Sequence, residues 1–186
     1  SGYLAWSLVA KAQVDRAATQ SLTAMGLGDA PRFSTPMPFN TLLWRVVAMT
    51  PSGYVVGDRS VVADEGVMHF DGHPSNVQAL REARDLPAVQ RLTWFNRGFM
   101  RAQVVDERLL LSDLRMGLEP DYTFNFVVAE RRDGRWQRIV PEQVRTDYGS
   151  PQARADAARR LRAMWTRIWQ QPAGSGSPAA QARAPQ

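Results

Sequence analysis

Apolar and polar positions alternate over short runs through the middle of the chain, which is typical of strands that bury one face. The clearest case is residues 122–140, where Phe124, Phe126 and Val128 occupy every second position from 124 to 128. Asp133-Gly134 within that segment is a strong two-residue turn signal and predicts a hairpin.

Further strands follow from the same kind of pattern. Residues 41–49 and 54–62 are rich in β-forming residues and flank the turn signal Pro51-Ser52-Gly53, so they predict a second hairpin. A short third strand is expected at residues 67–70, and two more strands on either side of Asp106-Glu107.

Helical segments are predicted at both ends and once between the strands. The first helix begins near residue 3 and meets its stop signals at Gly26 and Gly28. Residues 75–96 predict two short helices that divide near Leu86-Pro87. A last helix is expected after Ser150 as cap, with one apolar stripe made of Ala158, Leu161, Met164, Trp165, Ile168 and Trp169.

This order of elements predicts an α+β fold with a mostly antiparallel sheet of about six to seven strands, flanking N- and C-terminal helices and a short helical insert. Strands and helices do not alternate regularly, which argues against a Rossmann-type fold. We expect three regions: a membrane-proximal helix over residues 1–28, a single α+β soluble domain over 29–171, and a disordered tail over 172–186.

Composition excludes several kinds of site. The 186 residues include no cysteine, which removes disulfides, thiolate zinc sites and cysteine nucleophiles. No window is long and apolar enough to predict a transmembrane helix within the chain. The net charge is +5, and all the basic residues except Lys11 are arginines. This bias fits either anion recognition or a GC-rich codon preference.

The first helix opens on an unusually apolar and aromatic run. Tyr3, Leu4 and Trp6 precede Lys11, an arrangement that occurs where a membrane helix leaves the bilayer. A helix packed on the core of its own domain could have the same apolar and aromatic residues at its start. The residues alone leave both interpretations open.

Both histidines lie in one short stretch, where His69, Asp71 and His73 take alternate positions. On a strand these side chains would share a face and could begin a divalent-metal site for a stand-alone metal-dependent hydrolase. A surface turn with two solvated histidines is the commoner meaning of such a cluster, and Gly72 and Pro74 interrupt the strand that the metal site requires.

The best polar constellation follows a predicted strand, where Asp113 and Arg115 alternate and can pair. Such a pair could serve general acid–base catalysis, but a structural ion pair at a sheet edge is the more common reading. If any polar group here meets a substrate, we expect Arg115 with Asp113 first, and then Arg45 and Arg97 as anion contacts. An arginine-rich face over residues 154–167 raises the alternative of an anionic lipid or nucleic-acid binding module.

Several separated stretches resemble a known family: "YLAWSLVAKAQVDR", "TPMPFNTLLWRVV", "VQRLTWFNRGFMR" and "LLLSDLRMGLEPDYTFNFVVAE". They are similar to the carboxy-terminal region of bacterial inner-membrane proteins of the YdjM-like family, which are classed as metal-dependent hydrolases. The resemblance covers about residues 3–170.

The resemblance implies that any catalytic metal belongs to the amino-terminal membrane part of the full-length protein, in a segment like His-Arg-Gly-x-x-His that has no counterpart here. This chain would then be a soluble accessory domain of the inner membrane without a cofactor of its own, and we expect it on the periplasmic side. Its partners would be the preceding transmembrane part and the membrane, with no nucleic acid expected. Tyr3, Leu4 and Trp6 would mark the exit from the bilayer.

Overall fold

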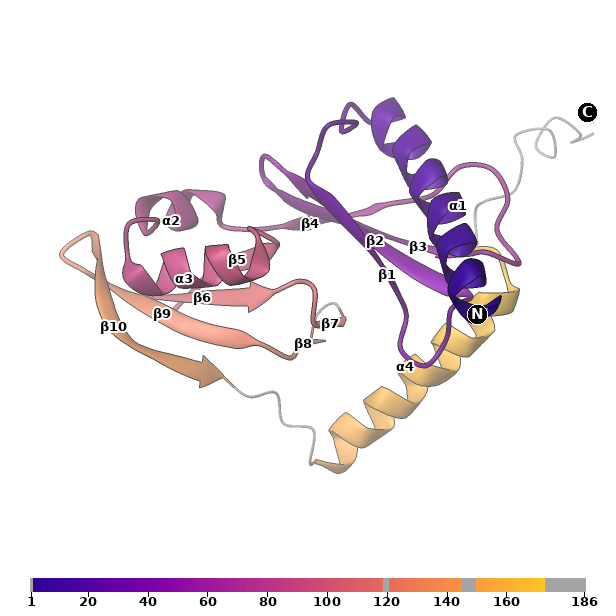
Figure 1. The fold of residues 1–186 in the computed structure, drawn as a ribbon. Helices are drawn as coiled ribbons and strands as arrows, with labels where there is room; N and C mark the ends of the chain where they lie inside the picture. Colours follow the sequence, from indigo (N-terminus) through magenta and orange to yellow (C-terminus); the bar gives the residue numbers. More distant parts are fainter. Residues whose placement is uncertain (1, 119–120, 145–149, 173–186) are drawn as a thin grey trace, which may run out of the picture.

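The computed structural model describes residues 2–118, 121–144 and 150–172, which form four helices and ten strands (Figure 1). In chain order these are α1 (Gly2–Ala24), β1 (Arg32–Pro36), β2 (Leu43–Thr50), β3 (Gly53–Ser60), β4 (Asp71–Pro74), α2 (Val77–Glu82), α3 (Pro87–Asn96), β5 (Met100–Val105), β6 (Arg108–Asp113), β7 (Gly117–Leu118), β8 (Asp121–Tyr122), β9 (Asn125–Arg132), β10 (Arg135–Val144) and α4 (Pro151–Trp169).

The predicted α+β class is confirmed: the strand pairs are antiparallel, helices flank them at both ends, and α2 and α3 form the helical insert. The strands do not form one sheet, however. One four-stranded sheet has the order β1-β2-β3-β4, a second has the order β10-β9-β6-β5, and β7 and β8 form a two-stranded ribbon.

Two sheets form because each has its own helical cover. The first sheet packs α1 against one face, where Ala10, Val14 and Ala18 meet Trp44 and Val46. The second sheet packs on the insert, with Ala79 of α2 and Val89 of α3 in its core. Each sheet must bury one apolar face against another element, and here each sheet buries it against its own helices.

The two sheets meet along a shared apolar cluster. Val47, Tyr54 and Val56 of the first sheet pack with two residues from the other side of the interface. These are Leu114, which follows β6, and Tyr122, which lies in β8. The rings of Phe33 and Phe99 also meet edge to face, with centroids 4.9 Å apart. This contact surface lies on the face opposite to α1 and covers part of that face.

The position of β4 corrects the sequence prediction. Residues 67–70 do not form the third strand, which instead spans Asp71–Pro74 and pairs with β3. Gly72 and Pro74 therefore do not break the strand. It lies at the sheet edge, where a missing proline N–H costs no ladder bond.

Helix α4 begins after its N-cap Ser150, whose hydroxyl accepts a hydrogen bond from the Ala153 N–H at 3.2 Å. Met164 and Ile168 pack on Met37 and Leu43. Of the predicted apolar stripe, Leu161, Trp165 and Trp169 remain exposed. Helix α4 therefore buries only part of the stripe against the first sheet.

Within the described residues, no helix is both long and apolar enough to cross a bilayer. Of the tail predicted over residues 172–186, residues 173–186 lie outside the described part of the chain.

Candidate functional site

Polar side chains from three strands share one face of the first sheet. Arg45 on β2 stands opposite Asp58 on β3 and donates two hydrogen bonds to it, from Nε to Oδ1 at 2.7 Å and from Nη2 to Oδ2 at 2.8 Å. On β4, Asp71 and His73 stand opposite Val56 and Tyr54. Because side chains alternate along a strand, all these residues face the same side.

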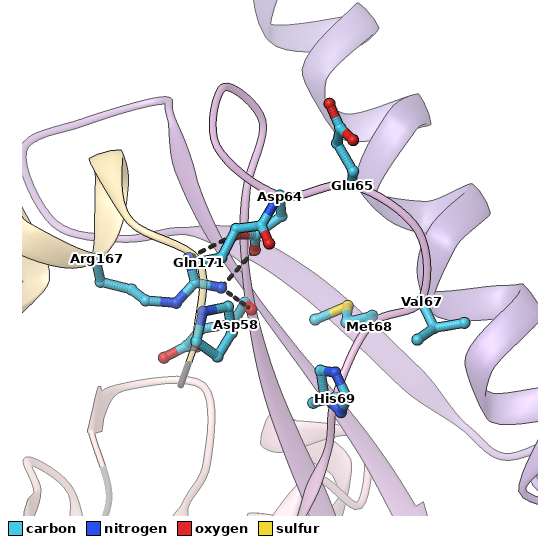
Figure 2. Close-up of a pocket in the computed structure, with 9 residues that line it drawn as sticks. Asp58, Asp64, Glu65, Val67, Met68, His69, Arg167 and Gln171 are labelled. Carbon is cyan, nitrogen blue, oxygen red and sulfur yellow. Dashed lines mark hydrogen bonds and ion pairs between the residues drawn. The ribbon is translucent and has the colours of Figure 1, made fainter. Parts of the chain in front are cut away.

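The last turn of α4 reaches the end of this face (Figure 2). Arg167 forms an ion pair with Asp64, with Nη1 at 2.8 Å from Oδ1, and its Nη2 donates to the Asp58 carbonyl oxygen at 3.0 Å. The Asp64 carboxylate also accepts the Ser60 N–H at 2.9 Å. Arg167 thus joins α4 to β3 and to the segment that follows it.

A hollow of about 380 Å³ lies over these groups, lined by Arg45, Val56, Asp58, His69, Asp71, His73, Arg167 and Pro172. A second hollow of about 290 Å³ lies between the two sheets and includes Arg45 and Arg115 in its lining. Arg45 therefore borders both hollows. We refer to the first of them as the polar groove.

The three residues predicted as a metal site all line the polar groove, but they have different surroundings. His73 is half-buried and stacks on the Tyr54 ring with centroids 5.3 Å apart, whereas His69 and Asp71 are exposed. His69 precedes β4 and is not on a strand. Within residues 2–118, 121–144 and 150–172, no group of three or more His, Asp or Glu side chains is arranged to hold a metal ion.

Asp113 and Arg115 do pair, at the turn after β6. The Asp113 carboxylate, only 5% exposed, accepts the Arg115 backbone N–H at 2.9 Å and its Nη2 at 2.9 Å. The hydrogen bond that the Arg115 guanidinium donates to Asp113 raises the pKa of Arg115, and the guanidinium lies 5.1 Å from the centre of the Phe95 ring. Both carboxylate oxygens of Asp113 are engaged by Arg115, which favours a turn-stabilising role.

Arg97 is separate from this region. It forms the left-handed C-cap of α3 with a φ of 55°, and its exposed side chain lines neither the polar groove nor the hollow between the sheets. Of the three arginines expected to contact an anion, the structure brings Arg45 and Arg115 together at the hollow between the sheets and leaves Arg97 apart.

Sequence reasoning missed Asp58 and the ion pair between Asp64 and Arg167. Asp58 could have been found, because a hairpin closed by Pro51-Ser52 places it opposite Arg45. Arg167 and Asp64 are separated by 103 residues, and nothing local signals that pairing. Arg59, also missed, points to the other face, where burial lowers the pKa of its guanidinium while it donates to the Gly66 carbonyl oxygen at 3.0 Å.

The groove combines arginine, carboxylate and imidazole groups on a rigid sheet, and each of its two arginines is already paired with a carboxylate. Such a balanced set can orient a polar ligand through hydrogen bonds. Comparisons with protein-family models, with curated proteins and with solved structures give no match for this chain.

Proposed function

We propose that this chain is a water-exposed accessory domain of a membrane-bound hydrolase and that it adjoins the bilayer through the first turns of α1. Its role is to hold polar groups near the membrane rather than to perform the hydrolysis. The proposal follows the resemblance to inner-membrane metal-dependent hydrolases of the YdjM-like family, whose metal centre is expected in their membrane part.

The proposal rests on a difference in burial between the two parts of α1. From Ala10 onward the helix buries a stripe against the first sheet that includes Val14, Ala18 and Leu22. Before Ala10 the large apolar side chains that the structure describes are instead exposed, with Leu4 at 62% and Leu8 at 69%.

The exposed apolar residues occupy more than one side of the helix. At roughly 100° per residue, Leu8 lies about 40° from Leu4 around the axis, whereas Val9 and Trp6 lie about 140° and about 200° from it. A single protein surface could cover one side of such a helix but not all of them. Hydrocarbon covers every side, and the aromatic Trp6 followed by Lys11 suits the boundary between lipid and water.

The polar groove lies toward this same end of the first sheet. Val61, which follows β3, packs in the cluster that contains Ala10, and Asp64 comes three residues later with its ion pair to Arg167. In the proposed orientation the groove faces the region in which the membrane part of the enzyme would present or release a polar substrate.

The test is binding of the chain to phosphatidylcholine vesicles, measured by co-flotation. Replacing Leu4 and Leu8 by asparagine removes two apolar side chains, each contributing about 2 kcal/mol when buried in hydrocarbon. We expect the double variant to bind at least about tenfold more weakly, since about 1.4 kcal/mol corresponds to a factor of ten.

The matched control replaces two exposed valines of the second sheet, Val105 and Val140, by asparagine. This variant is expected to bind as the unaltered chain does. Equal binding by the α1 variant, or no binding of the unaltered chain to any vesicle, would contradict the proposal.

A further inference from the structure

Helix α4 exposes a row of large apolar side chains that no other described element covers. Leu161, Trp165 and Trp169 recur every fourth residue, and the two tryptophans are 51% and 63% exposed. Met164 and Ile168, on the adjoining arc of the helix, are buried against the first sheet. We call Leu161, Trp165 and Trp169 the outer stripe.

The whole apolar arc of α4 is wider than its packing against the first sheet requires. At roughly 100° per residue, Met164, Ile168 and the outer stripe together span an arc of about 140°, and only its first part meets the sheet. Two indole rings left in water on one helix face form an apolar patch that marks an interaction surface.

The charge beside the outer stripe selects the partner. Helix α4 carries five arginines and one aspartate. Arg162 borders the stripe, about 20° from Trp169 in projection along the axis and two turns before it. It is exposed and has no ion-pair partner within the part of the chain that the structure describes. Tryptophan beside arginine on an amphipathic helix matches the interface of a bilayer that contains anionic lipid.

The outer stripe is also close to the proposed membrane contact of α1. Ala10 packs with Trp44 at the start of β2, and Ile168 packs with the preceding residue, Leu43, while its carbonyl oxygen accepts a hydrogen bond from the Ser60 hydroxyl at 2.6 Å. The first turns of α1 and the last turns of α4 therefore lie at one end of the same sheet, as Figure 1 also shows.

We propose that the outer stripe of α4 is a second membrane-binding surface, which lies in the headgroup region of an anionic bilayer beside α1. This inference rests on the proposed function and adds to it an orientation and a lipid class. Contact at both α1 and α4 prevents the domain from swinging about one helix. It also holds Arg167, and with it the polar groove, near the headgroups.

The test compares co-flotation of the chain with phosphatidylcholine vesicles that do or do not contain phosphatidylglycerol. Replacing Trp165 and Trp169 by serine is expected to weaken binding to the anionic vesicles by about tenfold or more, because two large apolar surfaces are lost. The control, Trp94→Ser, changes an even more exposed tryptophan on α3, at 81%, and is expected to leave binding unchanged.

A charge variant keeps the test valid if the serine variant does not fold. Arg162→Glu alters an exposed residue without an ion pair and is expected to weaken binding to the anionic vesicles about fivefold or more, with little effect on neutral ones. Circular dichroism checks the fold of every variant.

The outcomes separate the two proposals. If the α4 variants bind like the unaltered chain while the Leu4/Leu8 variant does not, the second surface is disproved and the proposed function stands. If the chain forms dimers without lipid and the serine variant is monomeric by sedimentation, the stripe binds a second copy, which also overturns this inference.

Discussion

Replacing Arg167 by alanine is expected to lower the free energy of unfolding by about 3 kcal/mol, because it leaves a nearly buried carboxylate without its cation. Asp64 is only 9% exposed and its main counter-charge is Arg167. The same substitution removes the hydrogen bond to the Asp58 carbonyl oxygen. Urea denaturation followed by circular dichroism measures the change.

Arg159→Ala on the same helix is the control. Arg159 pairs with Asp156 at the surface, and exposed pairs contribute at most about 1 kcal/mol. Adding Asp64→Asn to Arg167→Ala should recover part of the lost stability, since it removes the uncompensated charge. Similar stability of the Arg167 and Arg159 variants would show that α4 is not anchored by this ion pair.

The second large effect is expected at Gly57, in the middle of β3. A β-carbon there would lie 2.5 Å from the His69 carbonyl oxygen and 2.9 Å from side-chain atoms of Met68 and Phe70. Gly57→Ala therefore forces residues 68–70 away from the strand. We expect a loss of about 2 kcal/mol, typical of overpacking, together with displacement of His69 from the polar groove.

Gly72→Ala provides the matched comparison for this prediction. Gly72 lies on the neighbouring strand β4, and a β-carbon there would meet no atom within 4 Å. Its denaturation midpoint should stay close to that of the unaltered chain, and the amide and imidazole NMR signals of His69 should shift only in the Gly57 variant. If both variants were equally stable, the close approach of residues 68–70 to β3 would be wrong.

Local signals were sufficient for most of the secondary structure. The turn at Asp133-Gly134 has the positive φ angles, 51° and 75°, that a two-residue hairpin demands. Asp106 and Glu107 adopt the same conformation, at 49° and 57°. The glycine after α1, Gly26, likewise takes a positive φ of 75°. In each case a few neighbouring residues determine the turn or the helix end.

What escaped prediction depends on contacts between distant segments. The division into two sheets follows from which helix covers which strands, and no single strand records that choice. The ion pair of Arg167 with Asp64 and the exposure of Trp165 both depend on where α4 lies against the sheet end. Periodicity describes the apolar arc of a helix but not how much of that arc is covered.

The candidate site was partly within reach of the sequence. Alternation correctly predicted that Asp71 and His73 share a face. The register of the predicted hairpin could also have shown that Arg45 lies opposite Asp58. That His69, Arg45 and Arg167 border a single groove requires β4 to pair with β3 and α4 to return to the same sheet. Each of these steps brings together residues far apart in the chain.

The most direct test of the membrane-adjacent arrangement uses the absence of cysteine from the chain. A single cysteine at position 8 carries a polarity-sensitive fluorophore, and a second preparation carries it at position 138, exposed on β10. On adding vesicles, we expect a blue shift and loss of aqueous quenching at position 8 and no change at position 138. Emission at position 8 that remains characteristic of water in the presence of vesicles would contradict it.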